Sequence, residues 1–392
     1  MSLPRMSFPT MSLPAWMRTF LARRTPQNPA SALVQDGADP RDAVRPAGSS
    51  ALPASLAARI ERVAAGLRDG TVSRADLDAS VAGLAALPAS SVAVAGAAVA
   101  ALLLPPAGRW SSPGVLRDHR RADLAQLGAV SGLDRLFLFH PDGYVREAAL
   151  RAWEGPARTS FEIAAIAYRL NDWVRPVRSA ARDCAARVFP GTETGRAVEA
   201  LLFLLHRMPE WQRWQGGQAE APGNGVLGDL MARPDVCSRL AEHLVSARTG
   251  PAARLLQRAA RWPGLDPALP DLARRAFLPS VRACALRFLI EERATWPEGT
   301  RREWVDKTYG LARRVRVIGE RRLVRTSDLE TLIAMGAGDR SGLVRRVAAD
   351  GLAVHRAALG ERMHALVERL ADDTSPSVRW RAAFIQKERA AR

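Results

Sequence analysis

The sequence predicts an all-α protein made of repeated helix pairs. Alanine, which has the highest helix propensity, is abundant, and the alternating runs of Val, Ile, Thr and Tyr that typify strands are not apparent. The length, 392 residues, exceeds one ordinary core but suits an extended array. Most directly, a short sequence phrase recurs from residue 145 onward at a spacing typical of helical repeats.

The N-terminal part of the chain differs in composition from the rest. Residues 1–52 are rich in Pro, Ser, Gly and Ala and have no sustained helical period, which predicts a disordered tail. The pattern turns helical from about Leu56. We therefore expect degenerate helical repeats over residues 53–128 and a regular repeat array over residues 129–392.

An uncharged stretch within the first repeats raises the question of a membrane helix. No charged residue occurs between Asp78 and Arg109, and Val92–Leu104 is apolar throughout. These thirteen residues, at about 1.5 Å each, are too short for a hydrocarbon core of roughly 30 Å. We expect a buried helix here and no membrane partner, with a membrane helix within residues 79–108 as the minority alternative.

The recurring phrase is Val-Arg followed by Ala three residues after the Arg. Its copies are Val145-Arg146, Val177-Arg178, Val281-Arg282, Val344-Arg345 and Val378-Arg379, with a weaker copy at Ala253-Arg254. An aspartate stands six residues before the arginine in three copies, at Asp172, Asp339 and Asp373. Neighbouring copies are about 30 residues apart, and the gaps 178–254 and 282–345 each fit two units with one eroded copy between them.

This phrase resembles the HEAT repeat family, particularly its short bacterial form called PBS-lyase-like. The resemblance covers roughly residues 130–392 and implies an α-α superhelix, a HEAT-like solenoid. It also implies that the aspartate and arginine of each copy act within and between repeats. We call this series of charged residues the ladder, and its members are Asp172, Arg178, Arg282, Asp339, Arg345, Asp373 and Arg379. Such repeats serve many roles, so the resemblance predicts a fold and no activity.

Elementary physics gives these residues a structural role. An aspartate where the second helix of a pair begins can cap free backbone N–H groups and meets the positive end of the helix dipole. An arginine one turn inside that helix can reach the aspartate of the preceding repeat with a forked hydrogen bond. We therefore interpret the repeating arginines as framework rather than as a ligand site.

Charge and cysteine content constrain partners and compartment. The 57 Lys and Arg against 40 Asp and Glu give a net charge of +17, and only two of the basic residues are lysines. An acidic partner, such as nucleic acid or an acidic protein, is the usual reason for such an excess. Cys184, Cys237 and Cys284 are far apart and have no CxxC spacing, which favours a reducing compartment over disulfides or zinc. The first 25 residues do not resemble a secretory signal, so a cytoplasmic protein is expected.

The search for catalytic chemistry gives mostly negative results. HExxH, GxGxxG, GxxxxGK[ST] and GxSxG are absent from the sequence, and the six histidines are scattered. We predict no enzyme, no cofactor, no metal and no small-molecule substrate. Some HEAT-like solenoids are bacterial alkylpurine DNA glycosylases that use an aspartate and tryptophans in a basic groove. Trp304 and Asp306 resemble that arrangement only loosely, and the preferred interpretation is that Trp304 packs on the next helix.

The strongest local feature is the basic stretch from Arg301 to Arg325. Its nine basic residues against three acidic ones give +6, over a third of the net charge. They are Arg301, Arg302, Lys307, Arg313, Arg314, Arg316, Arg321, Arg322 and Arg325. Leu311, Val315 and Ile318 recur at four and three spacing, which predicts a basic amphipathic helix. The two interpretations are a solvated repeat helix and a patch that binds phosphate or acidic side chains.

A second break in the repeat pattern holds two tryptophans. Trp211 and Trp214 flank an arginine in a segment that becomes Gly-rich up to Gly225. Exposed, they would stack on bases or anchor a partner helix. The alternative, which we favour slightly, is that they fill the gap left by an eroded repeat.

These observations order three hypotheses about function. The first is a non-catalytic α-solenoid scaffold that binds a protein partner through its concave or basic surface. The second is a nucleic-acid-binding protein that uses the basic surface. A DNA-glycosylase-type enzyme is a distant third.

Overall fold

The fold was analysed in a computed structural model. It describes residues 52–104, 113–207, 211, 225–356 and 360–390, so the predicted tail and Trp214 lie outside the described residues. The described elements all belong to one unit of the chain. Eighteen α-helices, two short 3-10 helices and one pair of strands lie in these residues. The all-α prediction is therefore confirmed for most of the described residues and wrong for one segment.

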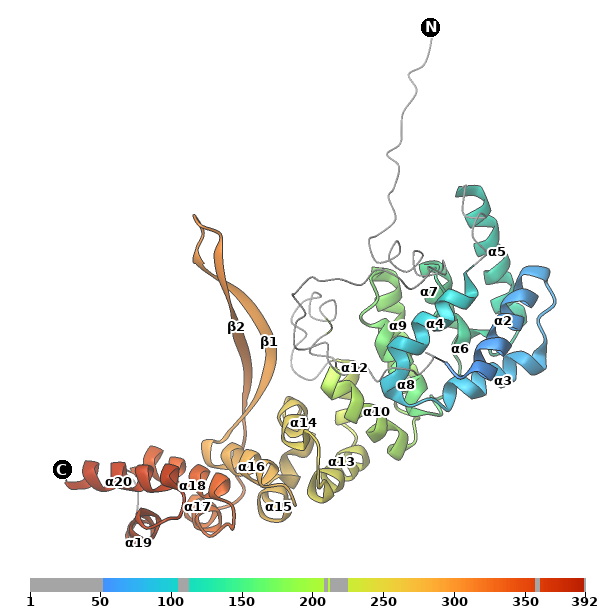
Figure 1. The fold of residues 1–392 in the computed structure, drawn as a ribbon. Helices are drawn as coiled ribbons and strands as arrows, with labels where there is room; N and C mark the ends of the chain where they lie inside the picture. The colour runs from blue at the N-terminus through green and yellow to red at the C-terminus, as the bar shows by residue number, and fades with distance from the viewer. Residues whose placement is uncertain (1–51, 105–112, 208–210, 212–224, 357–359, 391–392) are drawn as a thin grey trace, which may run out of the picture. The chain divides into compact units, whose positions relative to one another are not determined.

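The first half of the described chain is entirely helical (Figure 1). Its elements are α2 (Ala54–Asp69), α3 (Arg74–Ala85), η1 (Ala89–Ser91), α4 (Val92–Leu103), α5 (Pro113–Ala129), α6 (Leu133–Phe137), α7 (Gly143–Ala152), α8 (Ser160–Arg169), α9 (Arg175–Val188) and α10 (Thr194–Arg207). Several helices begin at a side chain that accepts a backbone N–H, as Ser73 does for α3 and Thr159 for α8.

The second half consists of helices and one inserted pair of strands. Its elements are α12 (Val226–Met231), α13 (Pro234–Ser246), α14 (Ala252–Ala259), η3 (Pro263–Ala268), α15 (Leu269–Arg275), α16 (Pro279–Glu291), β1 (Arg293–Asp306), β2 (Leu311–Arg322), α17 (Leu329–Ala337), α18 (Gly342–Val354), α19 (Glu361–Ala371) and α20 (Pro376–Ala390). Proline stands in the first turn of α9, α13, α15 and α16, where its missing N–H costs no helical hydrogen bond.

The helices contact one another in a regular order. Helices that open on neighbouring copies of the Val-Arg phrase contact each other: α7 contacts α9, α16 contacts α18, and α18 contacts α20. The partner helices contact one another in the same way, as α17 contacts α19. The valine and alanine of the phrase are buried in all five copies, so the phrase fills the interior between successive helices.

The uncharged helix α4 packs within the helical unit. It contacts α2 and α8, and its side chains Val92, Ala95, Val99 and Leu103 are buried. In the part of the chain that the structure describes, no single helix is long and apolar enough to span a membrane. The pair formed by α3 and the η1–α4 segment reaches that length and composition only together, and it is bent by 106°.

The basic stretch is not a helix, which corrects the prediction. It forms an antiparallel hairpin, here called the arm (Arg293–Arg322), whose two strands leave the helices together between α16 and α17 (Figure 1). The helical spacing of Leu311, Val315 and Ile318 was misleading, because Val317 continues an alternation of Val and Arg that has a period of two. The β-branched side chains in both strands favour the same state.

The arm also corrects the count of repeats. The long gap between Arg282 and Arg345 was expected to hold an eroded repeat, but it holds β1, β2 and α17. Two bulges interrupt the register, one between Pro297 and Gly299 and one between Trp304 and Asp306. The strands close in a turn at residues 307–310, in which Gly310 has φ +66°, a conformation that suits glycine.

Candidate interaction surface

The arginines of the repeated phrase hold neighbouring helix pairs together. Arg146 donates from Nε and Nη2 to the two carboxylate oxygens of Asp172, at 2.9 and 2.8 Å. Its Nη1 donates to the carbonyls of His140 and Pro141, in the turn before its own helix. Both side chains are buried, so the forked ion pair is shielded from water.

The same arrangement recurs along the chain. Arg282 donates from Nε and Nη2 to the two carboxylate oxygens of Asp339, at 2.7 and 2.9 Å, although the arm separates the two residues in sequence. Arg345 donates in the same way to Asp373, from Nε at 2.6 Å and from Nη2 at 2.8 Å. Arg146, Arg282 and Arg345 thus each reach the aspartate of the following copy. Our expectation that the arginine reaches the aspartate of the preceding repeat is wrong. Its Nη1 is bonded to the turn before its own helix, and this leaves Nε and Nη2 facing the aspartate of the next repeat.

The aspartates also stabilise the turns in which they lie. Asp172, Asp339 and Asp373 each accept a backbone N–H from the residue two positions later, at 2.7 to 3.0 Å. These bonds precede the helix by a residue or two, so the aspartates cap the turn rather than the helix itself.

The charged partners keep these carboxyl groups ionised. Burial opposes ionisation of Asp172, but hydrogen bonds from Arg146 and the charges of Arg169 and Arg146 outweigh it and lower its pKa. The hydrogen bond from Arg345 is the main cause of the lowered pKa of Asp373.

Sequence reasoning recognised Arg146 and Asp142 in the first copy of the phrase but assigned neither of them its partner. Arg146 was recognised as a copy of the phrase but not as the partner of Asp172. Asp142, the aspartate of the first copy, is held by Arg120 of α5 at 2.8 Å. Arg178 and Arg379 donate through Nη1 to carbonyls of their own turns. The ladder therefore begins at α5 and serves as framework.

The base of the arm is fixed to the helices. Arg321 binds Asp266 of η3 at 2.8 Å and donates to the carbonyls of Ala260 and Trp262. Trp296 is buried against Gly319 of the opposite strand, where a Cβ would overlap its indole. Arg325, just past β2, is half-buried. Arg321 is therefore anchored in the framework, and Arg325 is partly enclosed by it.

The two faces of the arm differ in charge. One face, here called the basic face, holds Arg293, Arg302, Arg314, Arg316 and Arg322 with a single acidic residue, Glu320, which pairs with Arg293. The opposite face balances Arg301 and Arg313 with Glu303 and Asp306, and Arg313 binds Glu303 at 2.9 Å. Lys307 lies in the turn. The alternation of strand side chains thus gathers the positive charge on one face.

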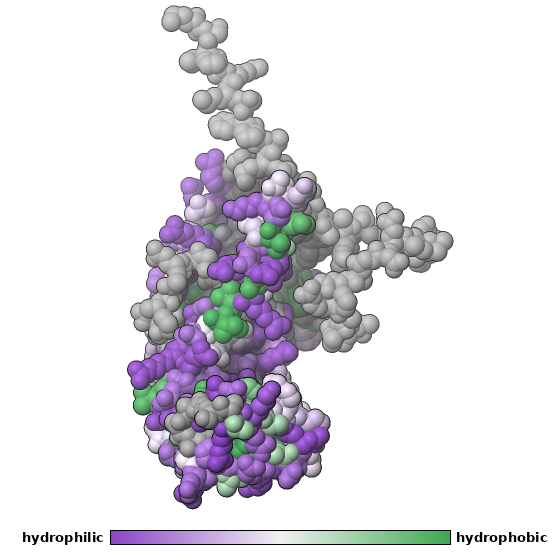
Figure 2. All heavy atoms as spheres, turned by 90° about the vertical axis from the view of Figure 1, so that its left-hand side faces the viewer, coloured by the Kyte–Doolittle hydropathy of each residue, from purple (hydrophilic) through white to green (hydrophobic). Residues whose placement is uncertain are grey.

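The basic face is exposed and its cations are available. Arg302, Arg314, Arg316 and Arg322 are exposed and form no ion pair with any described residue. Figure 2 views the molecule from the side on which the arm lies in Figure 1, and hydrophilic residues dominate it, with hydrophobic ones in small separate groups.

An aromatic residue lies within the basic face. Trp304 is 47% exposed, and the guanidinium carbon of Arg302 lies 4.2 Å from its ring centroid. The expectation that Trp304 packs on the next helix is wrong. Asp306 accepts the backbone N–H groups of Thr308 and Tyr309 and so shapes the turn. Neither residue lines either of the two cavities described below.

Of the two interpretations of the tryptophan segment, the structure supports interior packing for Trp211. This side chain is 9% exposed and meets Tyr168 of α8 edge to face, with ring centroids 5.8 Å apart. Trp211 is therefore an interior residue rather than a contact point, and the prediction for Trp214 lies outside the described residues.

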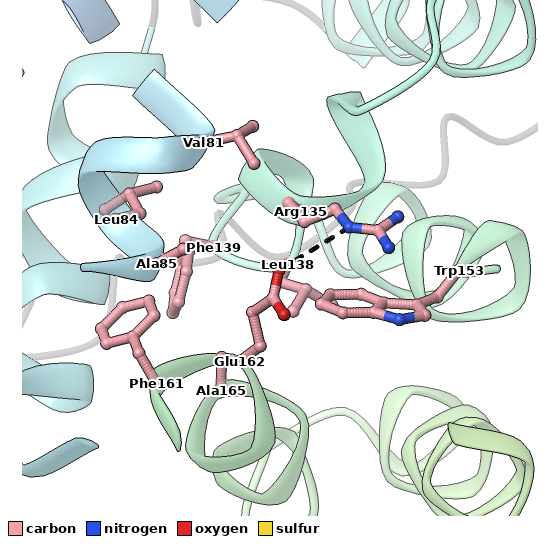
Figure 3. A pocket seen from close by; sticks show the side chains of 10 residues that line it. All are labelled: Val81, Leu84, Ala85, Arg135, Leu138, Phe139, Trp153, Phe161, Glu162 and Ala165. Carbon is pink, nitrogen blue, oxygen red and sulfur yellow. Dashed lines mark ion pairs between the residues drawn. The ribbon is translucent and has the colours of Figure 1, made fainter. Parts of the chain in front are cut away.

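Two small cavities lie among the described residues. One cavity lies where Arg135 stacks on Trp153 and faces Glu162 (Figure 3). Its volume of about 10 Å³ is at the limit for a single water molecule. Another of about 40 Å³ is bordered by His140, whose Nδ1 accepts the N–H of Asp142 while Nε2 lies 3.3 Å from Asp123. Both ring nitrogens are thus engaged.

The three cysteines are unpaired, and Cys184 and Cys237 are buried. Burial raises the pKa of the Cys184 and Cys284 thiols to about 12 and that of Cys237 to about 11, so these thiols are poor nucleophiles. Across the described ranges, no three His, Cys, Asp or Glu side chains come together in a group that could hold a metal ion.

Comparison with known proteins adds no assignment: no family model matches the chain, nor does any curated protein or solved structure.

Proposed function

We propose that this protein is a non-catalytic HEAT-like solenoid that binds nucleic acid through the basic face of its arm. The contacts between successive helix pairs and the arginine forks that join them support a solenoid scaffold. The exposed arginines on one face of a projecting two-stranded ribbon carry the proposal for nucleic acid.

The shape of the arm fits this role. The fourteen residues of β1 span roughly 46 Å at about 3.3 Å each, and the outer half of the strands is largely exposed. A two-stranded ribbon fits the major groove of DNA, and arginine forks match the geometry of phosphate. Four free guanidinium groups on one face would position the arm on a phosphate backbone without reading sequence.

The proposal is tested by the salt dependence of binding to a labelled DNA duplex, followed by fluorescence anisotropy. Four phosphate contacts predict that log K falls with log salt with a slope of roughly −3.6. The triple variant Arg302→Glu, Arg314→Glu, Arg316→Glu should reduce low-salt affinity by at least tenfold and bring the slope near −1.

A matched control separates the arm from net charge. Arg274, Arg362 and Arg369 are exposed on α15 and α19, and their reversal to Glu changes the charge of the protein equally. This control should retain most of the affinity. Equal losses in both triple variants, or no binding by the wild type at low salt to either the duplex or a single strand of equal length, would refute the proposal.

A second candidate function is binding of a protein partner, the first of our sequence-based hypotheses. Tyr144 and Trp173 are 61% and 64% exposed. Their turns are adjacent, because a Cβ at Gly143 would lie 2.9 Å from the side chain of Val174. Exposed Trp and Tyr are the residues that most often dominate protein interfaces.

Site-specific photocrosslinking tests this candidate. A photoreactive residue in place of Trp173 should give discrete protein adducts in the native cell, and Tyr144→Ala in the same chain should weaken them. The same probe in place of Trp380, which is 68% exposed on α20, is the control. Identical adducts from both positions would count against a partner at Tyr144 and Trp173.

A further inference from the structure

The tryptophan of the basic face has surroundings that suit a nucleobase. Trp304 lies on the outer part of the arm, next to Arg302 on its own strand and diagonal to Arg314 on the other. The residue directly opposite is Ala312, whose side chain is too small to cover an indole. The ring therefore remains 47% exposed among cations, although an apolar ring on a soluble protein usually gains by burial.

We propose that Trp304 stacks on an unpaired base of single-stranded nucleic acid while the arginines around it bind the flanking phosphates. This inference rests on the proposed function and names its ligand class. Every base has a π-face, so such stacking tolerates any sequence. Arg302, which stacks on the ring, adds a cation that a phosphate beside the stacked base neutralises.

The turn at the end of the arm extends the same surface. Tyr309 is 79% exposed, and the two N–H bonds to Asp306 hold the turn in shape. The opposite face of the arm lacks both features, because its charges balance and it carries no aromatic side chain outward of Trp296. Cations and aromatic rings thus coincide on the basic face and its turn, as in surfaces that follow a single strand.

The test compares three ligands of equal length by fluorescence anisotropy: an oligothymidine, the same backbone with abasic sites, and a duplex. Trp304→Ala should weaken oligothymidine binding by roughly fivefold or more and leave binding to the abasic strand unchanged. Trp304→Phe should retain most of the affinity, because phenylalanine keeps a stacking surface. Oligouridine of the same length, added as a fourth ligand, tells whether DNA or RNA is preferred.

Two controls make the result decisive. Trp380→Ala removes another exposed tryptophan, and it should leave all affinities unchanged. The far-ultraviolet circular dichroism of Trp304→Ala should match the wild type, because the side chain lies outside the helical interior. If Trp304→Ala binds oligothymidine like the wild type, or loses as much on the abasic strand, the stacking is refuted while nucleic-acid binding survives. If the wild type binds none of the ligands, both proposals fail.

Discussion

At the scale of single residues, the same side-chain type has two unlike roles in this protein. Arg146 and Arg282 are 3% exposed and are held by carboxylates and carbonyls, whereas Arg314 and Arg316 are exposed and form no ion pair with a described residue. Sequence position predicts the first group, because each of its members follows a buried valine in a repeated phrase. The second group is recognised only when the strand places its members on one face.

The buried pair of Arg146 and Asp172 should be costly to break. Asp172→Ala leaves a buried guanidinium without its partner, and we expect the free energy of unfolding to fall by about 3–5 kcal/mol. Urea denaturation followed by circular dichroism at neutral pH measures this. Asp76→Ala, which breaks the exposed pair with Arg62, should cause a clearly smaller loss.

The double variant Arg146→Met, Asp172→Leu tests the stated reason for that loss. Arg169, which is 11% exposed and pairs with Asp172 at 3.0 Å, then remains as the one buried cation of this cluster without a carboxylate, so part of the stability should return. A double variant no more stable than Asp172→Ala would show that the loss arises from the pair with Arg169, from packing or from the turn bond to Val174 instead.

At the scale of elements, the helices were predictable and the arm was not. Proline in the first turn and valine and alanine at helical spacing predict helices such as α9 and α20, in which these valines and alanines are buried. The arm contains too few apolar residues for its period to be decided, and three of them happen to match a helix. Cross-strand pairing supplies the missing information, because Trp296 against Gly319 and Glu303 against Arg313 are contacts between residues distant in sequence.

The candidate site was predictable in content but not in geometry. All nine basic residues of the predicted patch lie in the arm or directly after it, yet Arg321 is bound to Asp266, and Arg301 and Arg313 lie on the opposite face. Trp304 was assigned to packing because a tryptophan in a helical array is normally interior. Its exposure depends on the strand that carries it and on the small residue opposite.

At the scale of the whole molecule, the ladder couples stability to pH. Asp172, Asp339 and Asp373 all have lowered pKa values in the native state, against about 3.9 in an unfolded chain. Their contribution to stability is therefore complete above about pH 4 and is lost as the pH falls through the native pKa values. Asp134 acts in the opposite direction, because burial raises its pKa and protonation favours the native state.

Among the carboxyl groups of the described residues, the pKa is lowered for the three ladder aspartates and also for Asp76, Glu193, Asp235 and Asp328, and it is raised only for Asp134, which predicts net acid destabilisation. The urea midpoint should be nearly constant between about pH 7 and pH 5 and should fall steeply below about pH 4. The triple variant Asp172→Asn, Asp339→Asn, Asp373→Asn should be less stable at neutral pH but should lose less on further acidification, because its ladder has no carboxylate to protonate. Parallel profiles for variant and wild type would mean that other carboxyl groups govern acid unfolding and that the ladder does not join the helix pairs energetically.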